Sequence, residues 1–134
     1  MASNNQGPSM LKTLLSHLGL RRDPPAPACD PAAIESREQA QALFQAGRLD
    51  RALLFPLALG GQDHEANAVY LPLGLAAMKQ RLDATLLSYA EQGLITKLTI
   101  EPQYKGRSVI PARIVMKGSN PDREGRFEPV LEVW

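Results

Sequence analysis

The clearest periodic signal in the chain lies between Leu75 and Glu91, where apolar side chains recur three or four positions apart. The apolar positions are Leu75, Met78, Leu82, Leu86 and Tyr89. This spacing places them on one face of a helix, which we predict over 75–91 and which the following glycine ends. The charged residues of the segment, Lys79 and Asp83 among them, are expected to lie away from this apolar face.

Three later segments, 94–101, 109–117 and 127–134, alternate between apolar and polar positions, as strands with one buried face do. In the middle segment Ile110, Ala112, Ile114 and Met116 are expected to face inward, and Arg113 and Lys117 outward. Short polar turns separate the three segments. They therefore predict an antiparallel meander with the long helix packed on one face.

The first half of the chain predicts a second helix and two further strands. Asp30 is a good N-cap and Pro31 suits the first helical position, so a helix is expected over 30–46. The continuous apolar run 51–59 predicts a strand buried on both faces, and 68–71 predicts a shorter one. The predicted fold class is α+β, an antiparallel sheet of about five strands covered by two helices.

The segment before Asp30 differs in composition from the rest of the chain. Three prolines between positions 24 and 27, with alanines among them, are typical of an extended spacer. Residues 10–20 predict a short amphipathic helix, which would need a docking partner to be stable. We therefore expect a flexible arm and proline-rich spacer over 1–29 and a single α+β domain over 30–134.

Composition narrows the class of protein without naming an activity. The 134 residues carry 15 Lys and Arg against 14 Asp and Glu, a net charge of +1, which does not favour non-specific binding to nucleic acid. A single cysteine, Cys29, excludes an intrachain disulfide framework. No apolar run is long enough to span a bilayer, and the N-terminal segment lacks the pattern of a secretory signal, so a cytoplasmic location is expected.

One stretch combines basic and aromatic residues in a way that is typical of binding surfaces. It covers the predicted 109–117 strand, the turn before it and the last residue of the chain: Tyr104, Lys105, Arg107, Arg113, Lys117 and Trp134. We predict that these six residues bind a protein partner. The alternative is that Glu101, Glu128 and Glu132 neutralise the basic residues across the sheet.

The polar loop 62–67 holds the densest group of metal-ligand residue types. Asp63, His64 and Asn67 form a candidate site for a divalent metal such as Mg²⁺, with His64 available as a base. We favour a solvated turn, because adjacent loop residues seldom converge on one ion without other support. No cofactor is therefore expected, and the divalent metal is the alternative.

Residues 52–115 carry a longer pattern: an apolar segment ending in Gly60-Gly61, a polar loop, Asn67-Ala-Val-Tyr-Leu-Pro72, a helix and a strand pair. This pattern resembles the DNA/RNA non-specific endonuclease-type domains of bacterial polymorphic toxins. The resemblance implies that Asn67 would match a metal ligand. The position of the family's catalytic histidine is occupied by Leu53, which cannot act as a base.

The departure at Leu53 implies a relative without catalytic activity. We therefore predict a non-enzymatic bacterial interaction protein, an immunity or accessory protein that binds and occludes a toxin. Two alternatives stay open at this point. One is a metal-dependent nuclease-like enzyme using the 62–67 loop, and the other is an adaptor that docks through the 10–20 helix.

Overall fold

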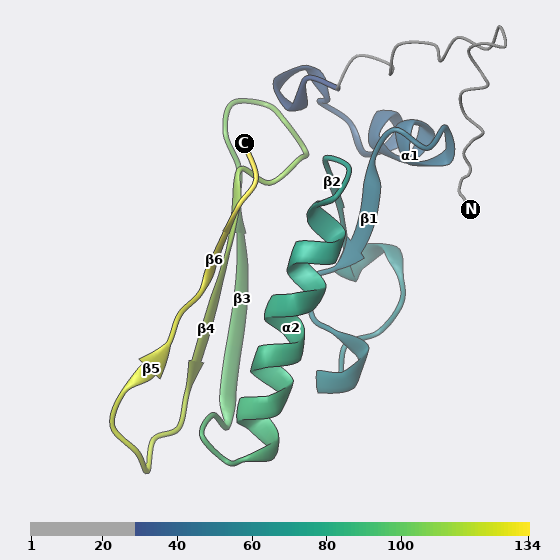
Figure 1. The fold of residues 1–134 in the computed structure, drawn as a ribbon. Coiled ribbons are helices and arrows are strands. Elements are labelled where there is room, and N and C mark those ends of the chain that lie inside the picture. The colour runs from purple at the N-terminus through teal and green to yellow at the C-terminus, as the bar shows by residue number, and fades with distance from the viewer. Residues whose placement is uncertain (1–28) are drawn as a thin grey trace, which may run out of the picture.

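The computed structural model describes residues 29–134 and has the predicted α+β class, with two α-helices and six antiparallel strands (Figure 1). The helices are α1 (Arg37–Gln45) and α2 (Leu75–Glu91). The strands are β1 (Asp50–Leu53), β2 (Ala68–Leu71), β3 (Lys97–Gln103), β4 (Arg113–Ser119), β5 (Arg126–Phe127) and β6 (Val130–Glu132). The predicted adaptor helix over 10–20 lies outside the described residues.

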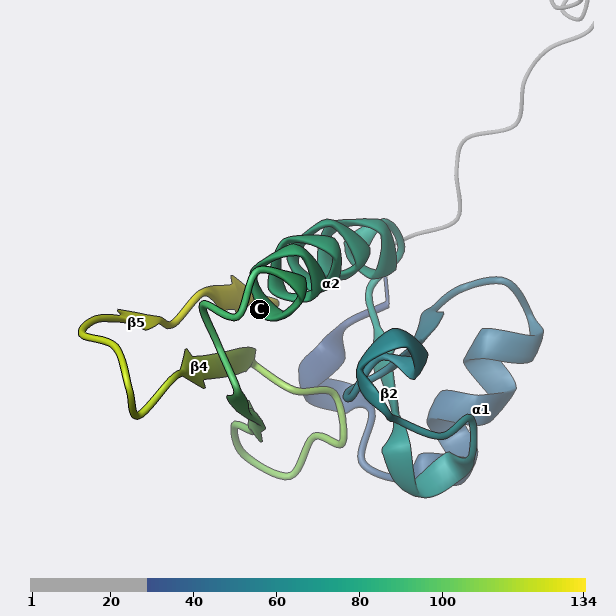
Figure 2. The ribbon, with the colours of Figure 1, turned by 90° about the horizontal axis from the view of Figure 1, so that it is seen from below.

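The strands form two sheets rather than the predicted single one. β1 and β2 make a two-stranded sheet, and β3, β4, β5 and β6 make a second one, in which β4 pairs with all three others. α2 runs along the four-stranded sheet and also contacts β1 (Figure 1). Seen from below, α1 lies on the side of β2 that faces away from the four-stranded sheet (Figure 2). α2 is therefore the element that both sheets share.

The predicted helix over 30–46 is interrupted, and this prediction was wrong in its first turn. Asp30 does cap a helical turn, by accepting a hydrogen bond from the amide of Ala32, but that 3-10 turn ends at Ala33. Ile34 is extended and only 2% exposed. Ser36 then provides a second N-cap for α1. The break coincides with burial of the Ile34 side chain in a cluster with Leu49, Tyr70 and Ile110.

Two of the predicted strands are shorter than expected. The 51–59 strand ends at Leu53, and Leu57–Leu59 is a 3-10 turn that begins after Pro56. The four residues of β1 are half-buried, so burial on both faces was wrongly predicted. The 127–134 strand is divided at Pro129 into β5 and β6. Pro129 lacks the amide that a continuous ladder would need, whereas β1 already ends three residues before Pro56.

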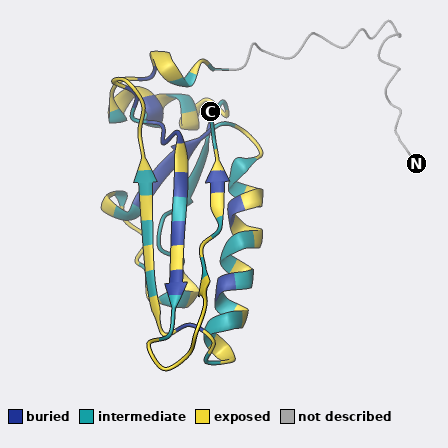
Figure 3. Ribbon diagram, turned by 90° about the vertical axis from the view of Figure 1, so that its left-hand side faces the viewer, coloured by how far each residue is buried: buried dark blue, intermediate teal, exposed yellow. Residues whose placement is uncertain are grey.

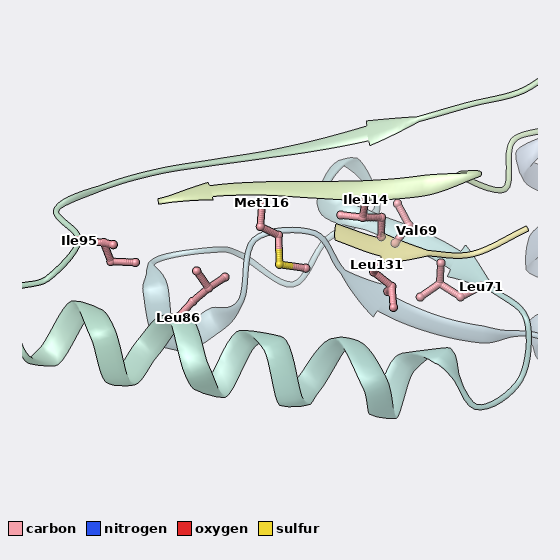
Figure 4. Packing of buried hydrophobic residues seen from close by; sticks show 7 residues of the cluster. All are labelled: Val69, Leu71, Leu86, Ile95, Ile114, Met116 and Leu131. Atoms are coloured by element: carbon pink, nitrogen blue, oxygen red, sulfur yellow. The ribbon is translucent and has the colours of Figure 1, made fainter. Parts of the chain in front are cut away.

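The main core lies between α2 and the two sheets (Figure 4). It consists of Val69, Leu71, Leu86, Ile95, Ile114, Met116 and Leu131, all at most 6% exposed. A second, smaller cluster joins α1 to β2 and to the segment before β4 through Ile34, Ala40, Leu49, Tyr70 and Ile110. β4 alternates between exposed and buried positions as predicted, with Ile114 and Met116 inward (Figure 3).

The buried face of α2 differs from the prediction at one turn. Leu75, Leu82, Leu86 and Tyr89 pack into the core, but Met78 is 46% exposed and Lys79 is only 1% exposed. Position 79 follows Leu75 by four residues and precedes Leu82 by three, so it lies on the same helical face as the core leucines. Lys79 was assigned to the polar face because it is charged, although its position in the helix is that of a core residue. Neither described helix is long and apolar enough to cross a membrane.

Candidate functional site

Four of the six predicted partner-binding residues lie together at one end of the four-stranded sheet. A cavity of about 300 Å³ is lined by Gln103, Tyr104, Lys105, Ala112, Arg113, Glu132 and Trp134. We call it the Trp134 cavity. It lies where the β3–β4 connection meets the chain end marked C in Figure 1. Two of the predicted residues, Arg107 and Lys117, do not line it.

Trp134 is held rigidly at this end of the sheet. Its indole Nε1 donates a hydrogen bond to the carbonyl of Ile110 at 3.0 Å, and its backbone amide donates to the carbonyl of Ala112 at 3.1 Å. The Nζ of Lys105 lies 4.5 Å from the centroid of the indole ring, within cation–π range. Trp134 therefore offers a fixed aromatic face with a cation above it.

Tyr104 is the exposed aromatic residue of the Trp134 cavity. It is 48% exposed, which leaves a large apolar surface available to a partner. Partial burial raises the pKa of its hydroxyl, and the positive charge of Arg37 opposes that shift. The hydroxyl is therefore protonated at neutral pH and can donate a hydrogen bond.

Two of the six residues are neutralised across the sheet, as the alternative interpretation expected. Arg113 and Glu132 face each other in register on β4 and β6, with 2.6 Å between the guanidinium and the carboxylate. Lys117 lies 3.8 Å from Glu101. Lys105 instead contacts the indole ring, so it is the cation of the Trp134 cavity that no intramolecular carboxylate pairs among residues 29–134.

Asn67, the residue that matches a metal ligand in the predicted family, ties the 54–62 loop to β2. Its Oδ1 accepts a hydrogen bond from the amide of Phe55 at 3.0 Å. Its Nδ2 donates to the carbonyls of Phe55 and Gln62, both at 2.9 Å. Both the oxygen and the nitrogen of the side-chain amide are thus hydrogen-bonded to the backbone, and these bonds fix the 54–62 loop.

Asp63 and His64 differ in their surroundings within the 62–67 loop. Asp63 forms an ion pair with Arg51 at 3.1 Å, and His64 is exposed at the start of a 3-10 turn (Glu65–Asn67). Within the described part of the chain, no three His, Cys, Asp or Glu side chains gather closely enough to hold a metal ion. Asp63 and Asn67 are thus engaged by other residues of the chain, and the Mg²⁺ site stays the alternative prediction.

The most strongly perturbed carboxylate of the loop is Glu65, which sequence analysis did not single out as a functional residue. A 2.7 Å hydrogen bond from the Tyr70 hydroxyl is the main cause that lowers the pKa of Glu65 to about 2. A hydrogen bond from Gln41 and the ion pair with Arg37, at 2.9 Å, act in the same direction. Glu65 therefore joins α1, the loop and β2, which indicates a role in stability.

Glu65→Gln should make the free energy of unfolding depend less on pH below pH 4.5. The carboxylate has a pKa near 2 in the folded protein and about 4.5 when unfolded, so its contribution is complete above pH 4.5 and is lost as the pH falls toward 2. The side chain is 40% exposed, so screening reduces the loss at neutral pH to about 1 kcal/mol. Urea unfolding at several pH values would test this, and an unchanged slope below pH 4.5 would contradict it.

Lys79 and Asp83 form a buried ion pair that lines a further cavity, although sequence analysis placed both residues on the polar side of the helix. The Nζ of Lys79 donates to the carbonyl of Leu54 at 2.9 Å and to both carboxylate oxygens of Asp83 at 3.0 Å. Burial lowers the pKa of Lys79 and raises that of Asp83, and their mutual attraction opposes both shifts. The three donors of Lys79 are thus satisfied, so the pair joins α2 to the 54–62 loop.

Comparisons with known proteins add no assignment to this geometry. No protein-family model, curated protein or solved structure matches the chain. The resemblance of residues 52–115 to the endonuclease-type toxin domains stays a prediction. The functional evidence is therefore the arrangement of side chains around Trp134.

Proposed function

We propose that this chain is a non-enzymatic interaction protein of the bacterial cytoplasm, an immunity or accessory protein that binds and occludes a toxin. The observation that supports it is the Trp134 cavity, where Lys105 lies over a fixed indole ring beside an exposed Tyr104. Tyr, Trp and Arg are the residues that most often dominate the binding energy of protein interfaces. This cavity combines all three.

The rigidity of the aromatic group favours binding. Trp134 is already fixed by two hydrogen bonds, so a partner that covers it causes little further loss of side-chain freedom. Lys105 has no carboxylate partner among the described residues and would attract an acidic side chain of the toxin. We therefore expect a toxin surface that presents a carboxylate next to an apolar group.

The test is direct binding to a candidate toxin, the product of a gene adjacent to the one encoding this chain. Isothermal titration calorimetry should show a complex that Lys105→Glu weakens by about 100-fold, because a like charge replaces the attraction. Tyr104→Ala should weaken it by about tenfold through loss of aromatic contact area. In a growth assay, both variants should protect less well against the toxin.

Arg81→Glu is the matched control, since Arg81 is an exposed cation on α2 and lies outside the Trp134 cavity. It makes the same change of charge and should leave the affinity unaltered. Circular dichroism would establish that all three variants are folded. Equal loss of affinity in Arg81→Glu and Lys105→Glu, or no complex with any adjacent gene product, would refute the proposal.

A further inference from the structure

One face of the four-stranded sheet packs on α2, and the other is largely exposed. Ile114, Met116 and Leu131 point into the core beside α2, so the residues between them lie on the opposite face. We call this opposite surface the outer face, and Figure 3 views the molecule from the side of this sheet. It is formed by alternate residues of β3 and β4, beginning at Lys97 and Arg113, together with Arg126, Val130 and Glu132.

At the end of the outer face nearest the β4–β5 connection, the strand register aligns two cations with a hydroxyl group. Ser119 on β4 lies opposite Lys97 on β3 and opposite Arg126 on β5. Residues that face each other on neighbouring antiparallel strands have Cβ atoms about 5 Å apart. The long side chains of Lys97 and Arg126 can therefore both reach a group that is bound above the hydroxyl of Ser119.

These three residues line a cavity of about 410 Å³, which we call the Ser119 cavity. Its other lining residues belong to the β4–β5 connection: Asn120, Pro121, Arg123 and Gly125. Asn120 fixes the start of this connection, because its Nδ2 donates a hydrogen bond to the carbonyl of Gly93 at 2.8 Å. The amide of Arg123 in turn donates to the carbonyl of Asn120 at 3.0 Å. These bonds fix the backbone that brings Arg123, a third cation, to the cavity.

The three cations of the Ser119 cavity are largely without partners in the described part of the chain. Arg126 lies 3.6 Å from Glu128 in an exposed pair, which contributes little. Lys97 and Arg123 form no ion pair with any carboxylate of residues 29–134. Among the same residues, no carboxylate lines the cavity. The positive charge of this part of the surface is therefore available to an anion.

The rest of the outer face carries little excess charge. Lys117 lies 3.8 Å from Glu101, and Arg113 lies 2.6 Å from Glu132. The unpaired positive charge is thus confined to one end of the sheet. Nucleic acid carries a phosphate at every step, so a strand that followed the outer face would approach these carboxylates. The distribution of charge therefore favours a compact anion over a long one.

We propose that the Ser119 cavity binds a phosphate monoester group. Such a group carries nearly two negative charges at neutral pH and offers three acceptor oxygens, which is more than a carboxylate offers. Lys97, Arg123 and Arg126 would surround the phosphate with charge-assisted hydrogen bonds, and the hydroxyl of Ser119 would donate to it from below. The site lies at the other end of the sheet from the Trp134 cavity, and it does not depend on the function proposed for that cavity.

The probe is the peptide Gly-Ala-phosphoserine-Ala-Gly, titrated into the full chain and followed by the NMR shifts of the backbone amides. The double variant Lys97→Glu/Arg123→Glu should weaken binding by at least about tenfold, because two attractive charges become repulsive. Ser119→Ala should weaken it by about threefold to tenfold through loss of one hydrogen bond. Added salt should weaken it as well.

Matched controls separate this site from the rest of the surface. Arg81→Glu, at an exposed cation of α2, and Lys105→Glu, in the Trp134 cavity, should both bind the phosphopeptide as the unaltered chain does. Competition with inorganic phosphate distinguishes the sources of the ligand. Equal affinity for phosphate and peptide would indicate a small phosphate compound, whereas tighter binding of the peptide would indicate a phosphorylated side chain of a partner, and both results support the proposal.

Four results would overturn the proposal. The first is the absence of amide shifts around Ser119 with either phosphate probe. The second is an affinity that the double variant shares with the unaltered chain while circular dichroism shows both to be folded. The third is equal binding of a peptide with Glu in place of phosphoserine, which would indicate simple attraction of anions. The fourth is tighter binding of a single-stranded oligonucleotide of similar charge than of the peptide.

Discussion

Lys79→Met is expected to lower the free energy of unfolding by about 3–5 kcal/mol. Methionine has nearly the same length but cannot donate to the carboxylate of Asp83, which is only 17% exposed. The substitution therefore leaves a buried negative charge without its partner, and the carbonyl of Leu54 without its donor. The cost of these two unsatisfied groups exceeds any gain from a more apolar side chain.

The double variant Lys79→Met/Asp83→Leu tests whether the two residues contribute to stability as a coupled pair. It removes both charges, so we expect it to recover most of the loss and to remain about 1–3 kcal/mol below the unaltered chain, because the Leu54 carbonyl stays unsatisfied. Urea unfolding followed by circular dichroism measures each value. Lys97→Met, at an exposed lysine, should change stability by less than about 0.5 kcal/mol. Additive effects of the two single changes would contradict a coupled pair.

Gly61→Ala should destabilise the protein by about 2–4 kcal/mol, because the added methyl group would meet the backbone. A Cβ at this position would lie 1.9 Å from the carbonyl oxygen of Phe55. That oxygen accepts a hydrogen bond from Asn67, and the amide of Gly61 itself donates to Pro56. Relief of the clash would therefore move the loop and weaken both bonds.

The control for this prediction is Gly118→Ala. A Cβ there would lie 3.1 Å from atoms of the Ile95 side chain, which can shift by a few tenths of an ångström. We expect a loss of less than about 1.5 kcal/mol from this change in thermal or urea unfolding. If both alanine variants had the same stability, the close approach of Gly61 to Phe55 would not be the cause of the larger effect.

The parts of the fold that could be predicted are the segments whose apolar residues recur at helical or strand spacing. The 75–91 helix has the observed bounds, and the alternation of 109–117 assigned Ile114 and Met116 to the core correctly. Both patterns arise within one element, which contacts the core along its whole length. The spacing of apolar residues in such an element therefore predicts which of its side chains contact the core.

The errors lie where distant contacts decide the local structure. The helix at 30–46 breaks because Ile34 packs beside Ile110, far along the chain. Two sheets form in place of one because β1 and β2 pair only with each other among the described strands, and no pattern within a strand reveals its partner. Asp30 was the N-cap predicted for one long helix, whereas the structure uses it for a single 3-10 turn and Ser36 as the N-cap of α1.

The candidate site was predicted in part. The six residues were predicted as a stretch across one hairpin together with Trp134, and four of them line the Trp134 cavity because the β3–β4 connection and the last strand end at the same place. The buried Lys79 could have been found by testing each charged residue for its position among core leucines.

The position of β3 at the side of its sheet also bears on solubility. β3 pairs with β4 alone among the described strands, so its other edge could template the addition of strands from further copies. Lys97 and Glu101 place charges along this edge, and Pro102 lacks an amide that an incoming strand would use. These three residues protect the chain from edge-to-edge aggregation. Variants that remove the charge of Lys97 are therefore expected to aggregate more readily at high protein concentration.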